Sequence, residues 1–133
     1  MTLAISHTTV NALDAYAQSV WWADLLGWAE DPDDPNEPGH EECMIYAPDG
    51  SQAILFIDVP DAKQPLRNRI HFDLRPTDAS RDEEHERVLG LGATDVDDCR
   101  TDDGRGWWVM ADLEGNEFCI LRSDEERRAA GDL

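Results

Sequence analysis

The sequence predicts an α+β fold in which one module, a strand followed by a helix and further strands, occurs twice. Two observations predict it. Landmark residues recur in the same order at an offset of 64 or 65 residues, about half of the 133-residue chain. Each half also combines short apolar runs with one longer helical pattern that ends at a glycine. The paired landmarks are His7 and His71, Asp14 and Asp78, Leu26-Gly27 and Leu91-Gly92, and Asp49-Gly50 and Glu114-Gly115.

The residue pattern of the first half predicts a strand, a helix and two paired strands. Asp14 is the expected N-cap of the helix, and Gly27 is its expected left-handed stop. The acidic residues 30–42 contain three prolines and are predicted to form an extended loop. The strands are expected over residues 3–10, 43–47 and 52–59. The buried helix face is expected to contain Tyr16, Ala17, Val20, Trp21 and Leu25, and Trp22 is expected to pack in the core beside it.

The second half predicts the same order again. Residues 60–68 have linker character, and the helix is expected over residues 79–91 with Val88, Leu89 and Leu91 on its apolar face. The strands are expected over residues 69–74, 94–99, 107–111 and 116–122. The tail, residues 123–133, opens with the capping-box spacing of Ser123 and Glu126 and is predicted to contain a short exposed helix.

Composition restricts the partners. Thirty acidic residues against eleven basic ones give a formal charge of -19, which repels nucleic acid and anionic membranes. No stretch resembles an export signal or a membrane span, so we expect a cytoplasmic protein. Cys43, Cys99 and Cys119 lack the spacing of a disulfide framework and are expected to be reduced. The length favours a single domain over residues 1–133, with modules at 1–59 and 69–122.

The order of elements resembles the vicinal-oxygen-chelate superfamily, which includes glyoxalases, extradiol dioxygenases, and fosfomycin- and bleomycin-resistance proteins. The resemblance extends to about Arg122 and is carried by the strings WWADLLGW, RNRIHFDL, LGLGA and WVMADLEGNEFCIL, which are similar to those of glyoxalase-like proteins. It implies two βαβββ modules that form a half-open, eight-stranded barrel-like sheet with helices outside. It also implies a homodimer.

The resemblance implies a divalent-metal site on the first and last strands of the modules. His7 and His71 match two ligand positions, and Cys119 stands where a glutamate is usual. The three could hold zinc, iron, nickel or cobalt, and Glu117 could serve as a further ligand or as a general base. Alternatively, His7 and His71 are buried, hydrogen-bonded residues of the fold and Cys119 is a small hydrophobic residue.

Aromatic residues indicate a ligand cleft. Adjacent residues on a strand face opposite ways, so one of Trp107 and Trp108 packs under a helix while the other can line the cleft. We expect binding of a small apolar or aromatic molecule without a catalytic metal. The alternative is a metal-dependent lyase, isomerase or dioxygenase-like enzyme acting on a substrate with vicinal oxygens. The residues expected to line the cleft are Phe56, Asp58, Trp107 and Trp108.

Overall fold

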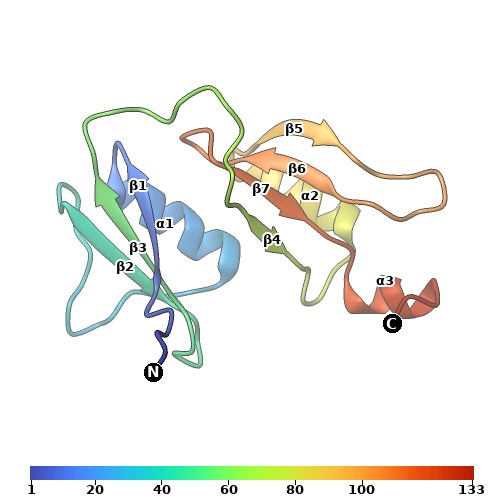
Figure 1. Ribbon diagram of the computed structural model, residues 1–133, viewed down its shortest axis with the longest axis horizontal. Coiled ribbons are helices and arrows are strands. Elements are labelled where there is room, and N and C mark those ends of the chain that lie inside the picture. Colours follow the sequence, from blue (N-terminus) through green and yellow to red (C-terminus); the bar gives the residue numbers. More distant parts are fainter. The chain divides into compact units, whose positions relative to one another are not determined.

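The chain folds into two compact units, Met1–Ala62 and Lys63–Leu133. The structure, a computed structural model, describes residues 1–133 (Figure 1). The boundary between the units falls within the linker predicted over residues 60–68. The single domain over residues 1–133 stays a prediction.

The first unit is a three-stranded sheet with one helix. Strand β3 lies in the centre, parallel to β1 and antiparallel to β2. Helix α1 packs against the sheet through β2 and β3. The elements are β1 (Thr8–Ala12), α1 (Ala15–Leu26), β2 (Glu42–Tyr46) and β3 (Ala53–Asp58).

The second unit is a four-stranded sheet in the order β4-β7-β6-β5, in which β4 and β7 are parallel and the other neighbours antiparallel. Figure 1 shows α2 behind this sheet and α3 near the C-terminus. The elements are β4 (Phe72–Leu74), α2 (Arg81–Gly90), β5 (Thr94–Asp98), β6 (Trp108–Ala111), β7 (Glu117–Ile120) and α3 (Asp124–Ala129).

The predicted α+β class and the repeat are confirmed, because the first and last strands of each unit are parallel neighbours. The strand count is seven instead of the expected eight. In the first unit, Ala29 makes only an isolated bridge with Tyr46 at the place where the second unit has β5. The two sheets of three and four strands are not closed.

Two strands begin later than predicted. Strand β1 starts at Thr8, since its parallel partner β3 begins only at Ala53, directly after the turn that follows β2. Residues 3–7 therefore have no strand beside them to continue the pairing. Strand β4 likewise starts at Phe72, close to the register at which β7 begins.

Helix α1 begins and ends where the sequence predicts. The Asp14 carboxylate accepts a hydrogen bond from Ala17 N at 3.0 Å, and Gly27 ends the helix with φ of 69°. Its predicted face was partly wrong, because Ala17 and Val20 are exposed. Apolar residues surround most of this helix, so periodicity did not single out one face. The buried residues are Ala15, Gln18, Ser19, Trp21, Trp22 and Leu25.

Helix α2 begins at a capping box that the sequence analysis missed. Ser80 accepts a hydrogen bond from Glu83 N, and the Glu83 carboxylate accepts one from Ser80 N. The buried face consists of Arg81, His85 and Val88. Because two of these residues are polar, hydrophobic periodicity could not identify this face.

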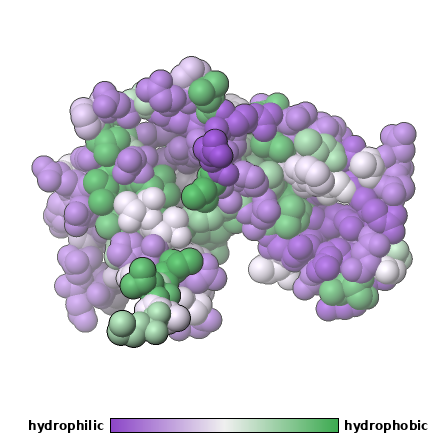
Figure 2. All heavy atoms as spheres, in the orientation of Figure 1, coloured by the Kyte–Doolittle hydropathy of each residue, from purple (hydrophilic) through white to green (hydrophobic).

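Each unit has its own core. Phe56 in the first unit and Phe118 in the second are fully buried. Figure 2 shows that hydrophilic side chains cover most of the visible surface and that hydrophobic ones form smaller patches, as the composition predicts. The tail helix α3 has the predicted capping box and no buried residue. No helix has both the length and the apolar character needed to cross a membrane.

Replacement of Phe56 by alanine tests the core of the first unit. Phe56 is 0% exposed, so Phe56→Ala should lower the free energy of unfolding by about 3–5 kcal/mol. Urea denaturation followed by circular dichroism measures this loss. Val20→Ala on the exposed side of α1 is the control, with a change within about 0.5 kcal/mol. A loss below about 1 kcal/mol in Phe56→Ala would place this ring outside the core.

Candidate functional site

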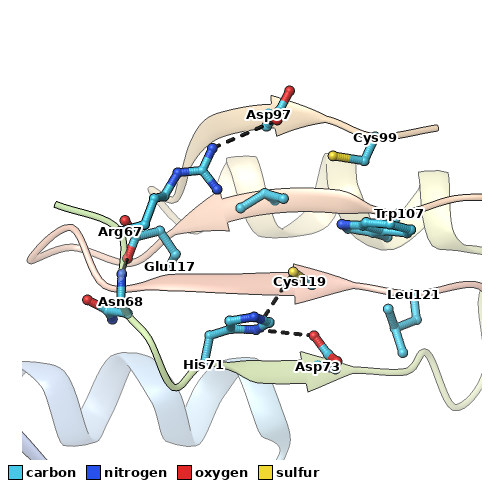
Figure 3. Close-up of a pocket in the computed structure, with 11 residues that line it drawn as sticks. Arg67, Asn68, His71, Asp73, Asp97, Cys99, Trp107, Glu117, Cys119 and Leu121 are labelled. Carbon is cyan, nitrogen blue, oxygen red and sulfur yellow. Dashed lines mark hydrogen bonds and ion pairs between the residues drawn. The ribbon is translucent and has the colours of Figure 1, made fainter.

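One face of the second sheet is hollowed into a groove of about 530 Å³. Alternate residues of the strands point into it, as the two-residue period of β-structure requires. Figure 3 shows this face with its side chains. The groove is lined by Arg67, Asn68, His71, Asp73, Asp97, Cys99, Trp107, Val109, Glu117, Cys119 and Leu121. All of these residues belong to the second unit.

Trp107 and Trp108 face opposite sides of the sheet, as predicted. Trp107 lines the groove and is 44% exposed. Trp108 is buried on the α2 side, where its ring stacks on His85 with centroids 3.7 Å apart and its indole N–H donates to Asp82. The placement of Trp108 in the ligand cleft was therefore wrong, because the alternation of β6 points its ring away from the groove.

The loop that leads to Trp107 is anchored by a buried arginine. Arg81 donates from Nη1 to the carbonyl oxygens of Gly104, Arg105 and Gly106. Gly106 has φ of 86°, and a Cβ atom there would lie 2.1 Å from the carbonyl oxygen of Cys99. Only glycine allows this approach. These contacts fix the backbone immediately before Trp107.

Glu117 lines the groove and lies beside Lys63. Its carboxylate lies 3.4 Å from Lys63 Nζ and accepts a hydrogen bond from Asn68 N at 3.1 Å. Burial alone would raise the pKa of Glu117, but the Asn68 hydrogen bond and the Lys63 charge bring it below its usual range. These contacts hold the linker against β7. The predicted catalytic role of Glu117 stays a prediction.

Cys119 and His71 lie side by side in the groove. The Cys119 thiol is buried, and Sγ lies 3.9 Å from His71 Nδ1. Burial, with a smaller effect of the Asp73 carboxylate, raises the pKa of Cys119 to about 11. The thiol is therefore protonated at neutral pH. His71 Nδ1 also lies 3.3 Å from an oxygen of Asp73.

The donor atoms of His71, Asp73 and Cys119 all lie within 4.8 Å of one another. Donors bound to one tetrahedral zinc ion at about 2.0–2.3 Å lie about 3.3–3.8 Å apart, so the measured 3.3 and 3.9 Å separations are close to that geometry. A nitrogen, sulfur and oxygen set suits zinc or cobalt better than magnesium or calcium. The residues of this groove therefore fit a divalent metal of that class.

The third predicted ligand, His7, belongs to the first unit. It is exposed, and its Nδ1 lies 3.0 Å from the hydroxyl oxygen of Ser6. The structure brings His71 and Cys119 together, and participation of His7 stays a prediction. The alternative interpretation of His7 and His71 as buried residues was wrong, because both are exposed, whereas Cys119 is buried.

Phe56 and Asp58 are not among the residues that line this groove. Phe56 is paired with Cys43, whose thiol hydrogen-bonds Ser19 on α1, so this side of β3 faces the helix. Asp58 accepts a hydrogen bond from Ala15 N at 2.7 Å, at the start of α1. Their placement in the ligand cleft was therefore wrong. The error is one residue in strand phase, which moves a side chain to the other face of the sheet.

Sequence reasoning missed Asp73, Arg67 and Cys99 as groove residues. Asp73 carried a usable signal, because it lies two residues after His71 on the same strand and must share its face. Arg67 precedes β4 and lies 3.8 Å from Asp97 across the sheet, a contact that no local pattern indicates.

The repeated strand–helix–strand unit, whose first and last strands pair in parallel, has the arrangement of the vicinal-oxygen-chelate fold. The match to a family model is more specific. Residues 7–121 match the model described as a glyoxalase-like domain, and the chain belongs to this family. No curated protein matches the chain.

Solved structures share the fold. A fosfomycin resistance protein, FosX, from Listeria monocytogenes, in complex with Mn(II) and 1S,2S-dihydroxypropylphosphonic acid, is 17% identical, with a TM-score of 0.67 over 96% of each chain. FosX from Mesorhizobium loti is 19% identical, with a TM-score of 0.63 over 98% of this chain and 99% of that one. The oxidase ChaP-H2 is 20% identical, with a TM-score of 0.56 over 91% and 94%. Identities this low show the fold alone.

The raised pKa of Cys119 predicts slow alkylation. With a pKa of about 11 instead of 9.0, the thiolate fraction at pH 8 is about a hundredfold smaller than in an unfolded chain. Mass spectrometry after iodoacetamide treatment should show slow modification that accelerates as the pH rises toward 11. The same protein in denaturant is the control. Equal rates in folded and unfolded chains at pH 8 would contradict this assignment.

Proposed function

We propose that the chain binds a small molecule with an apolar or aromatic part in the groove of the second unit, and that this binding needs no metal ion. The observation that carries the proposal is Trp107, a large aromatic residue that lines a concave surface and stays 44% exposed. Val109 and Leu121 extend the apolar surface beside it. Burying such a surface under a ligand is favourable.

The volume of the groove and its polar lining residues support binding of a small molecule. A volume of about 530 Å³ lies within the range of small-molecule sites, about 300–1,000 Å³. Polar groups of Arg67, Asn68 and His71 lie among the lining residues and would orient the polar part of a ligand. The anchored loop before Trp107 would reduce the ordering cost of binding, because its backbone is already fixed.

Charge and fold support proposals about the partners and the oligomeric state of the protein. The net charge of -19 disfavours nucleic acid and anionic membranes as partners. We further propose a cytoplasmic homodimer. The edge strands β2 and β5 each have one side without a strand neighbour, and a second copy could cover such an edge.

A metal-dependent reaction of the lyase, isomerase or dioxygenase-like kind is the second candidate. It is favoured by the close approach of donor atoms from His71, Asp73 and Cys119. A bound ion would polarise a substrate oxygen or acidify a bound water. Glu117 lines the same groove and would be the residue that moves a proton. This candidate predicts turnover that is lost on chelation.

Ligand-observed NMR with a panel of small aromatic and aliphatic compounds tests the first candidate, with EDTA present to exclude metal-mediated binding. We expect binders whose affinity falls by about tenfold or more in Trp107→Ala, because loss of one well-packed aromatic contact costs about 1.4 kcal/mol or more. Trp28→Ala in the first unit is the control and should bind like the parent. Binding that survives Trp107→Ala unchanged, or the absence of any binder, would refute the proposal.

A further inference from the structure

We infer that Glu117 is a positioning residue, which holds one wall of the groove so that the wall presents hydrogen-bond donors to an uncharged acceptor group of the ligand. The wall consists of residues 63–71, which precede β4 and contribute Arg67, Asn68 and His71 to the groove lining. The inference rests on the proposed function and deepens it, because it names the ligand class: an aromatic body that carries an amide or ketone oxygen. Glu117 acts through the wall, which differs from the proton transfer of the second candidate.

The wall lacks the usual means of holding a backbone in place. Residues 63–70 make no hydrogen bond from backbone to backbone. Apolar packing does not anchor them either, since Leu66 and Ile70 are largely exposed. The ion pair between Arg67 and Asp97 spans 3.8 Å between side chains that are both more than half exposed, and such pairs contribute little. The position of the wall therefore depends on contacts made by other polar side chains.

Glu117 supplies those contacts with both oxygens of one carboxylate. Oε2 accepts the hydrogen bond from Asn68 N at 3.1 Å, and Oε1 lies 3.4 Å from Lys63 Nζ. The same ammonium group donates to the carbonyl oxygens of Gln64 and Leu66, so Glu117 fixes this turn at its start and at its end. The side chains of Lys63 and Glu117 are only 16% and 11% exposed, so salt screens this pair less than it screens a surface pair.

The wall carries donors that have no hydrogen-bond partner within the second unit. The Arg67 guanidinium and the Asn68 carboxamide make no hydrogen bond there, and neither does Nε2 of His71. Figure 3 shows Arg67 and Asn68 beside Glu117 at one end of the drawn sheet, with Trp107 toward the other end. A ligand whose aromatic part lies on Trp107 therefore meets donors at its other end, where an acceptor oxygen fits.

Charge favours an uncharged acceptor over an anion. Asp97 already lies 3.8 Å from the Arg67 guanidinium, and the exposed carboxylate of Asp73 lines the same groove. The chain has a formal charge of -19, so the surrounding field repels a carboxylate ligand. The expected polar group is therefore an amide or ketone oxygen.

Binding of two matched indoles, followed by ligand-observed NMR in EDTA, tests the inference. Indole-3-acetamide carries an acceptor oxygen, and 3-ethylindole does not. We expect the parent to bind the amide about tenfold more tightly, the gain from one or two additional hydrogen bonds. In Glu117→Ala this preference should disappear, while the affinity for 3-ethylindole stays the same. Glu117→Gln keeps an oxygen that can accept from Asn68 N, so it should retain part of the preference.

Hydrogen exchange of the protein without ligand measures the positioning directly. The backbone N–H of Asn68 should exchange about tenfold faster or more in Glu117→Ala than in the parent, because its hydrogen bond is lost. Glu125→Gln on α3 makes the same chemical change at an exposed glutamate and is the control. It should exchange and bind like the parent, and circular dichroism should show that every variant is folded.

The inference is overturned if the parent does not prefer the amide, if Glu117→Ala keeps the preference, or if Asn68 exchange is unchanged in that variant. Tighter binding of indole-3-acetate than of indole-3-acetamide would overturn the uncharged ligand class. Equal loss of preference in Glu117→Gln and Glu117→Ala would show that the charged carboxylate itself is needed and would overturn the positioning role. If no aromatic compound binds at all, the proposed function fails and this inference with it, whereas binding without preference refutes this inference alone.

Discussion

The parallel pairing of β4 with β7 is the constraint on which the groove depends. Phe72, Asp73 and Leu74 lie opposite Phe118, Cys119 and Ile120, and Leu121 N donates to Leu74 O at 2.8 Å. This register places Asp73 beside Cys119. A shift of one residue in the register of β4 would turn Asp73 to the opposite face of the sheet and separate it from Cys119.

The two faces of the second sheet differ: one packs against α2, and the other forms the groove. On one face, Trp108 stacks between His85 of α2 and the guanidinium of Arg100, whose central carbon is 4.1 Å from the ring centroid. This packing holds the sheet against the helix and leaves the other face free for the groove. Arg81, buried at the start of α2, fixes the loop before Trp107 through hydrogen bonds to its backbone carbonyl oxygens. The opening of the groove thus rests on a rigid scaffold.

The sequence predicted the features that depend on local pattern. Asp14 and Gly27 bound α1 as expected, and the repeat predicted that a strand, a helix and further strands occur twice in the same order. Two features were harder to predict: the face of the sheet to which a strand residue points, and contacts between residues far apart in the sequence. Phe56 and Asp58 were assigned to the wrong face of β3, because its apolar run does not alternate and so carries no phase information. Asp73 gained its importance only from Cys119, 46 positions further along the chain. Buried Arg81 and His85 escaped detection because hydrophobic periodicity ignores polar residues.

Cross-strand nuclear Overhauser effects in isotopically labelled protein test this account most directly, since they report the register and facing of β4. The account predicts contacts between side-chain protons of Asp73 and Cys119, together with contacts between the Trp108 and His85 rings on the opposite face. It is contradicted if Asp73 shows contacts to residues of α2, or if Cys119 pairs with Phe72 or Leu74 instead.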